Sequence, residues 1–126
     1  MKICIYGAGA IGAWLGVELS LAGEDVTLIA RGPHLAAMQK NGVRLLIDGE
    51  EKVAHPSCVE DPAEAGPQDY VIITLKAHSL PGIADRLDPL LGPDTAVVTG
   101  VNGIPWWYFY KLDGPHENHK LESVDP

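Results

Sequence analysis

The sequence lacks the features of several protein classes. Its 126 residues include two cysteines, Cys4 and Cys58, with no C-x-x-C pair and no metal-ligand spacing. No run approaches the roughly 18 consecutive apolar residues of a membrane span. The apolar opening at 1–6 is too short for a signal peptide, because it runs directly into glycines. We therefore expect a cytoplasmic protein with no membrane partner, no structural disulfide and no metal site.

Basic charge is also scarce. The net charge of the chain is −8, which argues against a nucleic-acid partner because binding to a phosphate backbone needs a basic face. The charge is unevenly distributed, since residues 1–44 carry a net charge of +1 and residues 45–126 carry −9. The first third of the chain is therefore the part best suited to a polyanionic ligand.

Alternating strand-like and helix-like segments predict an α/β fold. Short apolar runs rich in β-branched residues predict strands at 2–6, 25–30, 69–75 and 95–99. Apolar residues at helical spacing predict helices at 10–22, 33–40 and 79–91. An Asp-Gly turn predicts a hairpin whose strands are 43–47 and 52–59. This order is typical of a doubly wound, Rossmann-type, mostly parallel sheet with an inserted β-hairpin.

A G-x-G-x-x-G motif connects the first predicted strand to the first predicted helix. It consists of Gly7, Ala8, Gly9, Ala10, Ile11 and Gly12. In this context Gly7 permits the tight turn, Gly9 lets backbone N–H groups approach a pyrophosphate, and Gly12 lets the helix pack against the strand. The N-terminus of the helix adds unpaired N–H groups and a partial positive charge. The motif predicts a dinucleotide site, and the alternative is a glycine-rich turn without a ligand.

Arg31 indicates which dinucleotide is bound. An NAD site places an acid at the end of the second strand, where it accepts a hydrogen bond from the ribose 2′-hydroxyl. Here Arg31 follows that strand, and a guanidinium can hold a 2′-phosphate with paired hydrogen bonds. We therefore predict NADP, although Arg31 could instead be an exposed charge at a strand end. His34 could flank the adenine or a phosphate, but a surface-loop histidine is the simpler interpretation.

Two polar residues follow later strands at the edge where open α/β sheets bind ligands. Lys76 follows the strand predicted at 69–75, and Asn102 follows the strand predicted at 95–99. Both could contact the cofactor or an anionic substrate, but a solvated lysine and an Asn-Gly turn explain them equally simply. His78 is close to Lys76 in sequence, but a lone loop histidine is more often without a catalytic role. We therefore assign no catalytic residue.

The C-terminal part differs in composition from the rest. Five of the eight aromatic residues are consecutive: Trp106, Trp107, Tyr108, Phe109 and Tyr110. One small domain cannot bury all five, so we expect this segment to contact another domain or a second copy of the chain. His116 and His119 have metal-like spacing but lie in a polar tail with no predicted helix to align them, so we predict no metal site there.

These segments together resemble the N-terminal domain of the ketopantoate reductase (2-dehydropantoate 2-reductase) family. The matching segments are KICIYGAGAIG at 2–12, VTLIAR at 26–31, VIITLKA at 71–77 and VNGI at 101–104. The glycine motif is shared with many dehydrogenases, whereas the combination of all four segments is fairly specific. The aromatic run after VNGI departs from the family pattern, which leaves the identity of the keto acid open.

The resemblance implies an NADPH-dependent oxidoreductase that reduces a 2-keto acid, ketopantoate, in pantothenate and coenzyme A synthesis. It implies that Gly7, Gly9 and Gly12 bind the pyrophosphate, Arg31 the 2′-phosphate, and that Lys76 and Asn102 lie at the nicotinamide and substrate edge. Family members are about twice as long, and their second, helical domain carries the catalytic lysine. We therefore expect residues 1–110 to form the NADP-binding domain and 111–126 to form a polar tail, with the helical domain missing and activity weak or absent.

Two other functions are compatible with the same sequence. One is a non-catalytic NADP-binding module that senses redox state, and the other is a domain used mainly for association through its aromatic segment.

Overall fold

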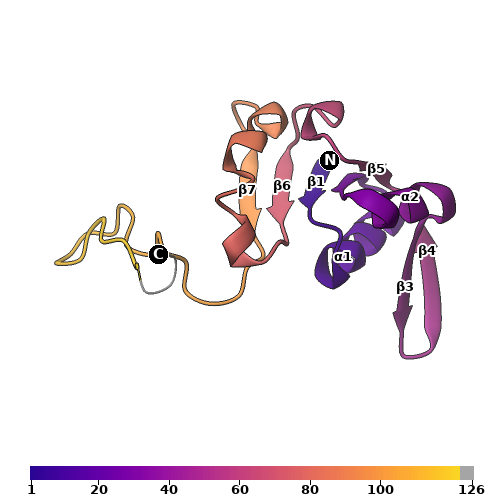
Figure 1. Cartoon of the computed structure of the whole chain (residues 1–126), viewed down its shortest axis with the longest axis horizontal. Helices are drawn as coiled ribbons and strands as arrows, with labels where there is room; N and C mark the ends of the chain where they lie inside the picture. The colour runs from indigo at the N-terminus through magenta and orange to yellow at the C-terminus, as the bar shows by residue number, and fades with distance from the viewer. Residues whose placement is uncertain (123–126) are drawn as a thin grey trace.

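A computed structural model describes residues 1–122 as a parallel sheet with one added hairpin. The five strands of the sheet are β1 (Lys2–Tyr6), β2 (Asp25–Ile29), β5 (Ser57–Val59), β6 (Tyr70–Ile73) and β7 (Ala96–Thr99). They pair in the order β5-β2-β1-β6-β7, and every pairing is parallel (Figure 1). The strand order therefore reverses between β1 and β6, which is where doubly wound sheets bind ligands. The predicted fold class is confirmed.

The alternation of side chains along β1 explains why the sheet is covered on both faces. Ile3 and Ile5 belong to one buried cluster, whereas Cys4 and Tyr6 belong to another. The first cluster includes residues of helices α1 (Ala10–Leu21) and α2 (Gly32–Asn41). The second includes Ile83 from the segment between β6 and β7. A strand buried on both faces is expected to be apolar, and β1 is apolar and buried from Ile3 to Ile5, with Tyr6 buried beside them.

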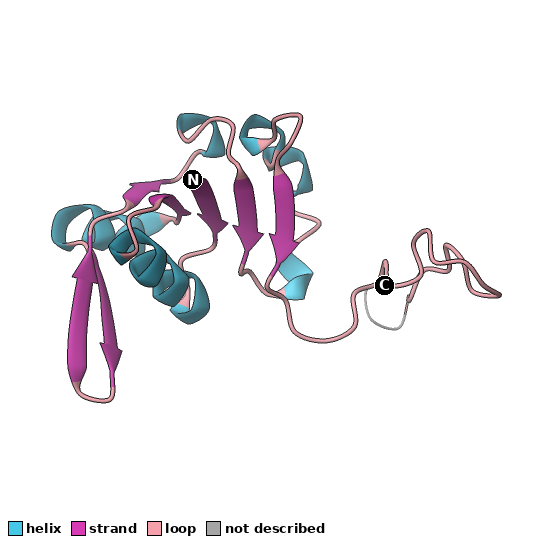
Figure 2. Cartoon of the chain, turned by 180° about the vertical axis from the view of Figure 1, so that it is seen from behind, coloured by secondary structure: helices cyan, strands magenta, loops and turns pink. Residues whose placement is uncertain are grey.

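The inserted hairpin consists of β3 (Val43–Ile47) and β4 (Glu50–Ala54), which pair antiparallel and project from the sheet (Figures 1 and 2). The prediction of a second hairpin strand at 52–59 is wrong in its extent. The chain leaves the hairpin after Ala54, and Ser57–Val59 pair with β2 in the main sheet instead. Pro56, which has no backbone N–H to donate, lies in the chain between β4 and β5.

The prediction of a helix at 79–91 is also wrong. This segment forms short 3-10 turns, η2 (Ala77–Ser79), η3 (Ala84–Arg86) and η4 (Asp88–Leu90). Pro81 and Pro89 cannot donate the backbone hydrogen bonds that a continuous α-helix requires. Ile83 and Leu90 are nevertheless buried against the sheet, so the apolar pattern identifies the covering face correctly. A further 3-10 turn, η1 (Pro62–Glu64), precedes β6.

The open edge of the sheet and the C-terminal segment are poorly covered. Strand β7 is exposed along its length, with Val97 46% and Val98 45% exposed on opposite faces. Residues 103–122 then extend away from the sheet without helices or strands (Figure 1). Residues 123–126 of the predicted polar tail lie outside the described residues. Among residues 1–122, no helix is both long and apolar enough to cross a membrane.

Burial of Cys4 generates a prediction about stability at alkaline pH. Cys4 is fully buried, and burial raises the pKa of its thiol from 9.0 to about 12. Below pH 9 the thiol is protonated in both the folded and the unfolded chain. Above pH 9 only the unfolded chain loses the proton, so the folded state loses stability as the pH rises.

We expect the free energy of unfolding, measured with urea, to fall by about 1.4 kcal/mol more between pH 8 and pH 10 in the wild type than in the variant Cys4→Ala. The variant is the control for all other groups that titrate in this range, including Cys58. Equal losses in the two proteins would contradict the prediction.

Candidate functional site

A pocket of about 1120 Å³ lies at the carboxyl ends of the strands. It lies at the position expected for a doubly wound sheet, beside the point where the strand order reverses. The predicted site residues that line it are Gly7, Ala8, Gly9, Ala10, Ile11, Arg31, Lys76 and Asn102. Of the predicted residues, Gly12 alone is absent from the lining. The fold thus brings together residues from four separate segments of the sequence.

The glycine motif forms the turn from β1 into α1. Gly7 has φ of +111°, a conformation that favours glycine, and its N–H donates to the carbonyl of Ile29 at 3.2 Å. Gly9 is the N-cap residue of α1, and the first turn of the helix contains no acidic residue. The unpaired N–H groups and the positive end of α1 therefore remain available to an anion in the pocket.

Gly12 contributes through packing and not through contact with the pocket. A Cβ atom at this position would overlap the carbonyl oxygen of Gly7 and lie 2.7 Å from Oγ1 of Thr74. Thr74 itself donates from Oγ1 to the Gly7 carbonyl at 2.6 Å. The start of α1, the glycine turn and the segment after β6 are therefore in direct contact. Sequence reasoning missed Thr74, which is 67 residues from Gly7.

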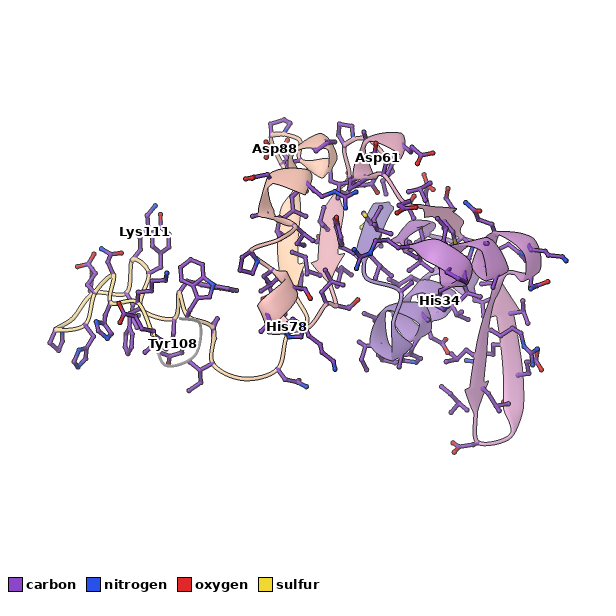
Figure 3. All side chains as sticks on the ribbon, viewed as in Figure 1. His34, Asp61, His78, Asp88, Tyr108 and Lys111 are labelled. Atoms are coloured by element: carbon purple, nitrogen blue, oxygen red, sulfur yellow. The ribbon has the colours of Figure 1, made fainter. Side chains whose placement is uncertain are left out.

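Arg31 and His34 bring positive charge and a ring donor to the β2 side of the pocket. Arg31 is the N-cap residue of α2, directly after Ala30, and its side chain is exposed. His34 lies in the first turn of α2 and not on a loop (Figure 3). Its Nε2 is 2.8 Å from the carbonyl oxygen of Ala8. The helix after β2 therefore contacts the glycine turn directly.

Lys76 and Asn102 line the pocket on the side of β6 and β7. Lys76 is exposed three residues after the end of β6 and precedes η2, which contains His78. Asn102 is exposed three residues after the end of β7. His78 also lines the pocket, so the segments that follow β6 and β7 both supply polar side chains to it.

The charged side chains of the pocket are mostly cationic, although the chain as a whole is acidic. Arg31, Lys76 and Arg86 line the pocket together with one acid, Glu60. Within residues 1–122, none of the three cations takes part in an ion pair. Arg86 donates from Nη2 to the backbone carbonyl of Glu60 at 3.3 Å. Sequence reasoning missed Arg86, because it lies inside the helix predicted at 79–91 and not directly after a predicted strand.

The two histidines of the tail lie beside an aromatic ring. No cluster of three or more His, Cys, Asp or Glu side chains suited to a metal occurs in residues 1–122. His116 and His119 lie beside the ring of Phe109, with centroid distances of 5.5 and 6.3 Å. The spacing of these two histidines therefore places both rings beside Phe109.

Comparisons with known proteins identify relatives of the chain. The sequence model of the family described as "Ketopantoate reductase PanE/ApbA" matches residues 3–105. A 2-dehydropantoate 2-reductase from Mesorhizobium japonicum is 52% identical over 127 residues, which cover 100% of this chain and 39% of that protein. A crystal structure from Ralstonia solanacearum MolK2, assigned as a ketopantoate reductase, has a TM-score of 0.89 at 45% identity and covers 99% of this chain and 39% of that one.

A third relative is a D-mandelate dehydrogenase, whose structure contains NADH and anilino(oxo)acetate. It has a TM-score of 0.76 at 30% identity, and the match covers 94% of this chain and 39% of that chain. This chain thus spans about two-fifths of the length of each of the three relatives.

Two glycines of the turn are predicted to differ in how much the fold depends on them. Gly12→Ala places a methyl group against backbone, so we expect it to destabilise the fold by about 3 kcal/mol. Gly9 has an ordinary φ of −72° and no atom within 4 Å of a Cβ position. We expect Gly9→Ala to change the free energy of unfolding by less than about 1 kcal/mol. Urea unfolding of both variants checks this, and equal destabilisation would contradict it.

Proposed function

The chain belongs to the ketopantoate reductase family, and on this premise we propose that it binds NADPH as the cofactor-binding part of a 2-dehydropantoate 2-reductase. The observation that carries the proposal is the meeting of the glycine turn and Arg31 in one pocket at the reversal point of the sheet. A pyrophosphate suits the N-terminus of α1. A 2′-phosphate suits the guanidinium at the end of β2.

We propose the following roles within residues 1–110, which we take as the cofactor-binding domain. Gly7 and Gly9, with Ala8, Ala10 and Ile11, present backbone to the pyrophosphate, and Gly12 keeps α1 close to β1. Arg31 holds the 2′-phosphate. Lys76 and Asn102 face the nicotinamide and the substrate.

The proposed reaction is the reduction of a 2-keto acid. NADPH, when bound, would supply a hydride for the keto carbonyl carbon, and the carbonyl oxygen would take up a proton from the solvent to give the hydroxy acid. The residues of this chain hold and orient the reactants: the glycine turn fixes the phosphates, and Lys76 offers an ammonium group to the substrate carboxylate. The D-mandelate dehydrogenase relative, which holds NADH and an oxoacetate derivative, supports a nicotinamide cofactor and a 2-oxo substrate class.

A non-catalytic NADP-binding or redox-sensing module would use the same pocket. Oxidation of NADPH in the presence of 2-dehydropantoate separates the two functions, because only a reductase couples loss of NADPH to formation of the hydroxy acid. The assay is made with the chain alone and with the remaining part of a relative added as a second polypeptide, since this chain spans 39% of the Mesorhizobium japonicum relative.

Arg31 generates the prediction that tests the cofactor. We expect Arg31→Ala to weaken NADPH binding about tenfold or more and to leave NADH binding nearly unchanged, because only NADPH has the 2′-phosphate. Dissociation constants are measured by titration of the nucleotide fluorescence. Lys40→Ala is the matched control, because it removes a cation from the last turn of α2 that does not line the pocket.

Three results would count against the NADP proposal. The wild type could bind neither dinucleotide, could prefer NADH, or could lose affinity for both equally in Arg31→Ala.

We propose that the aromatic segment Trp106–Tyr110 is an association surface for a second copy of the chain or a further domain. Trp106, Tyr108 and Tyr110 are 36%, 55% and 64% exposed, and exposed apolar patches usually mark contact surfaces. Strand β7, exposed on both faces, precedes this segment.

We expect the wild type to sediment as a concentration-dependent oligomer and the double variant Trp106→Ser, Tyr110→Ser to sediment closer to the monomer. Analytical ultracentrifugation across a hundredfold range of concentration provides the measurement. A monomeric wild type throughout would leave contact with a further domain as the one form of the proposal still standing.

A further inference from the structure

His34 is the donor in its hydrogen bond with the glycine turn. Nε2 of His34 is 2.8 Å from the carbonyl oxygen of Ala8. A carbonyl oxygen can only accept, so the ring must donate its Nε2–H. Both the neutral ring with its proton on Nε2 and the protonated ring can make this bond.

The hydrogen bond from His34 orients the whole peptide group between Ala8 and Gly9, and not only the carbonyl of Ala8. The carbonyl of Ala8 and the N–H of Gly9 belong to one planar peptide group and point in opposite directions. A hydrogen bond that holds the carbonyl therefore also fixes the direction of the Gly9 N–H. Gly9 is the N-cap residue of α1, so this peptide group sets how the chain enters the helix.

The Ala8 end of this peptide group is held by its buried side chain, whereas Gly9 has no side chain that could pack. No atom lies within 4 Å of the position a Cβ would occupy at Gly9. The turn is held by side chains from two neighbouring segments: Thr74 donates to the carbonyl of Gly7 at 2.6 Å, and His34 contacts that of Ala8. Removal of either donor leaves a turn carbonyl without its side-chain partner.

We propose that His34 is a positioning residue for the dinucleotide, which orients the Ala8–Gly9 peptide group so that the glycine turn is preformed for the pyrophosphate. The inference rests on the proposed cofactor function. Since NADPH and NADH share the pyrophosphate, loss of His34 weakens both to the same extent. This distinguishes His34 from Arg31, whose loss affects NADPH alone.

The test compares three variants of the full 126-residue chain. His34→Leu removes the donor, and His34→Gln restores an N–H donor on a side chain of similar reach. Gln39→Leu is the matched control on the same helix. Gln39 also donates from a side-chain nitrogen to a backbone carbonyl, that of Cys58 at 2.9 Å, but it does not line the pocket.

We expect His34→Leu to bind NADPH and NADH each about fivefold more weakly, the effect of one hydrogen bond of ordinary strength. His34→Gln should stay within about twofold of the wild type for both. Gln39→Leu should bind both as the wild type does. In the chain without cofactor, the amide resonance of Gly9 should shift in His34→Leu and return toward its wild-type position in His34→Gln.

Several outcomes would overturn the inference. Unchanged binding by a folded His34→Leu, or an unmoved Gly9 resonance, shows that the histidine does not position the turn. Loss of NADPH affinity alone shows direct contact with the 2′-phosphate instead. A wild type that binds neither dinucleotide overturns the proposed function itself. A wild type that binds both, with no effect of His34→Leu, overturns only the inference.

Discussion

The close approach of α1 to the carboxyl end of β1 is the constraint on which the fold and the pocket both depend. At Gly12 the helix lies so near the carbonyl of Gly7 that a Cβ atom has no room. Because the atoms on both sides of this contact are mostly backbone, neither can move without displacing the strand or the helix. Oγ1 of Thr74 donates to the same carbonyl at 2.6 Å. The helix therefore starts with only three residues between it and the end of the strand, and its free N–H groups lie at the pocket.

The electrostatics of the pocket follow from this arrangement and oppose the charge of the whole chain. The net charge is −8, yet three of the four formally charged side chains that line the pocket are basic. Arg31 follows β2, Lys76 follows β6 and Arg86 is the last residue of η3, so no single stretch of sequence looks basic. A low-dielectric wall lined by cations concentrates their field on the opening of the pocket. The acidic residues of β4 do not line this pocket.

Local patterns were enough to predict the sheet and the residues that come to its edge, but not the contacts between segments. Strand-like runs and the glycine motif each depend on a few neighbouring residues. They identified the parallel sheet and four of its five strands, whereas β5 was assigned to the hairpin. The helix expected at 79–91 failed because Pro81 and Pro89 remove backbone donors while the apolar spacing persists. The bond from His34 to Ala8 joins residues 26 apart, and that from Thr74 to Gly7 joins residues 67 apart. No local pattern carries such information.

The glycines of one motif meet different physical requirements, and this separates the fold from the function. Gly7 is required by its positive φ and Gly12 by the lack of space, so a protein with this fold needs both whether or not it binds a ligand. Gly9 has an ordinary φ and open space beside it. Nothing in the fold excludes a side chain at Gly9. A pyrophosphate that approaches the N-terminus of α1 would exclude one, because it needs the space beside the backbone. The middle glycine is therefore the residue of the motif that most directly supports the proposed dinucleotide site.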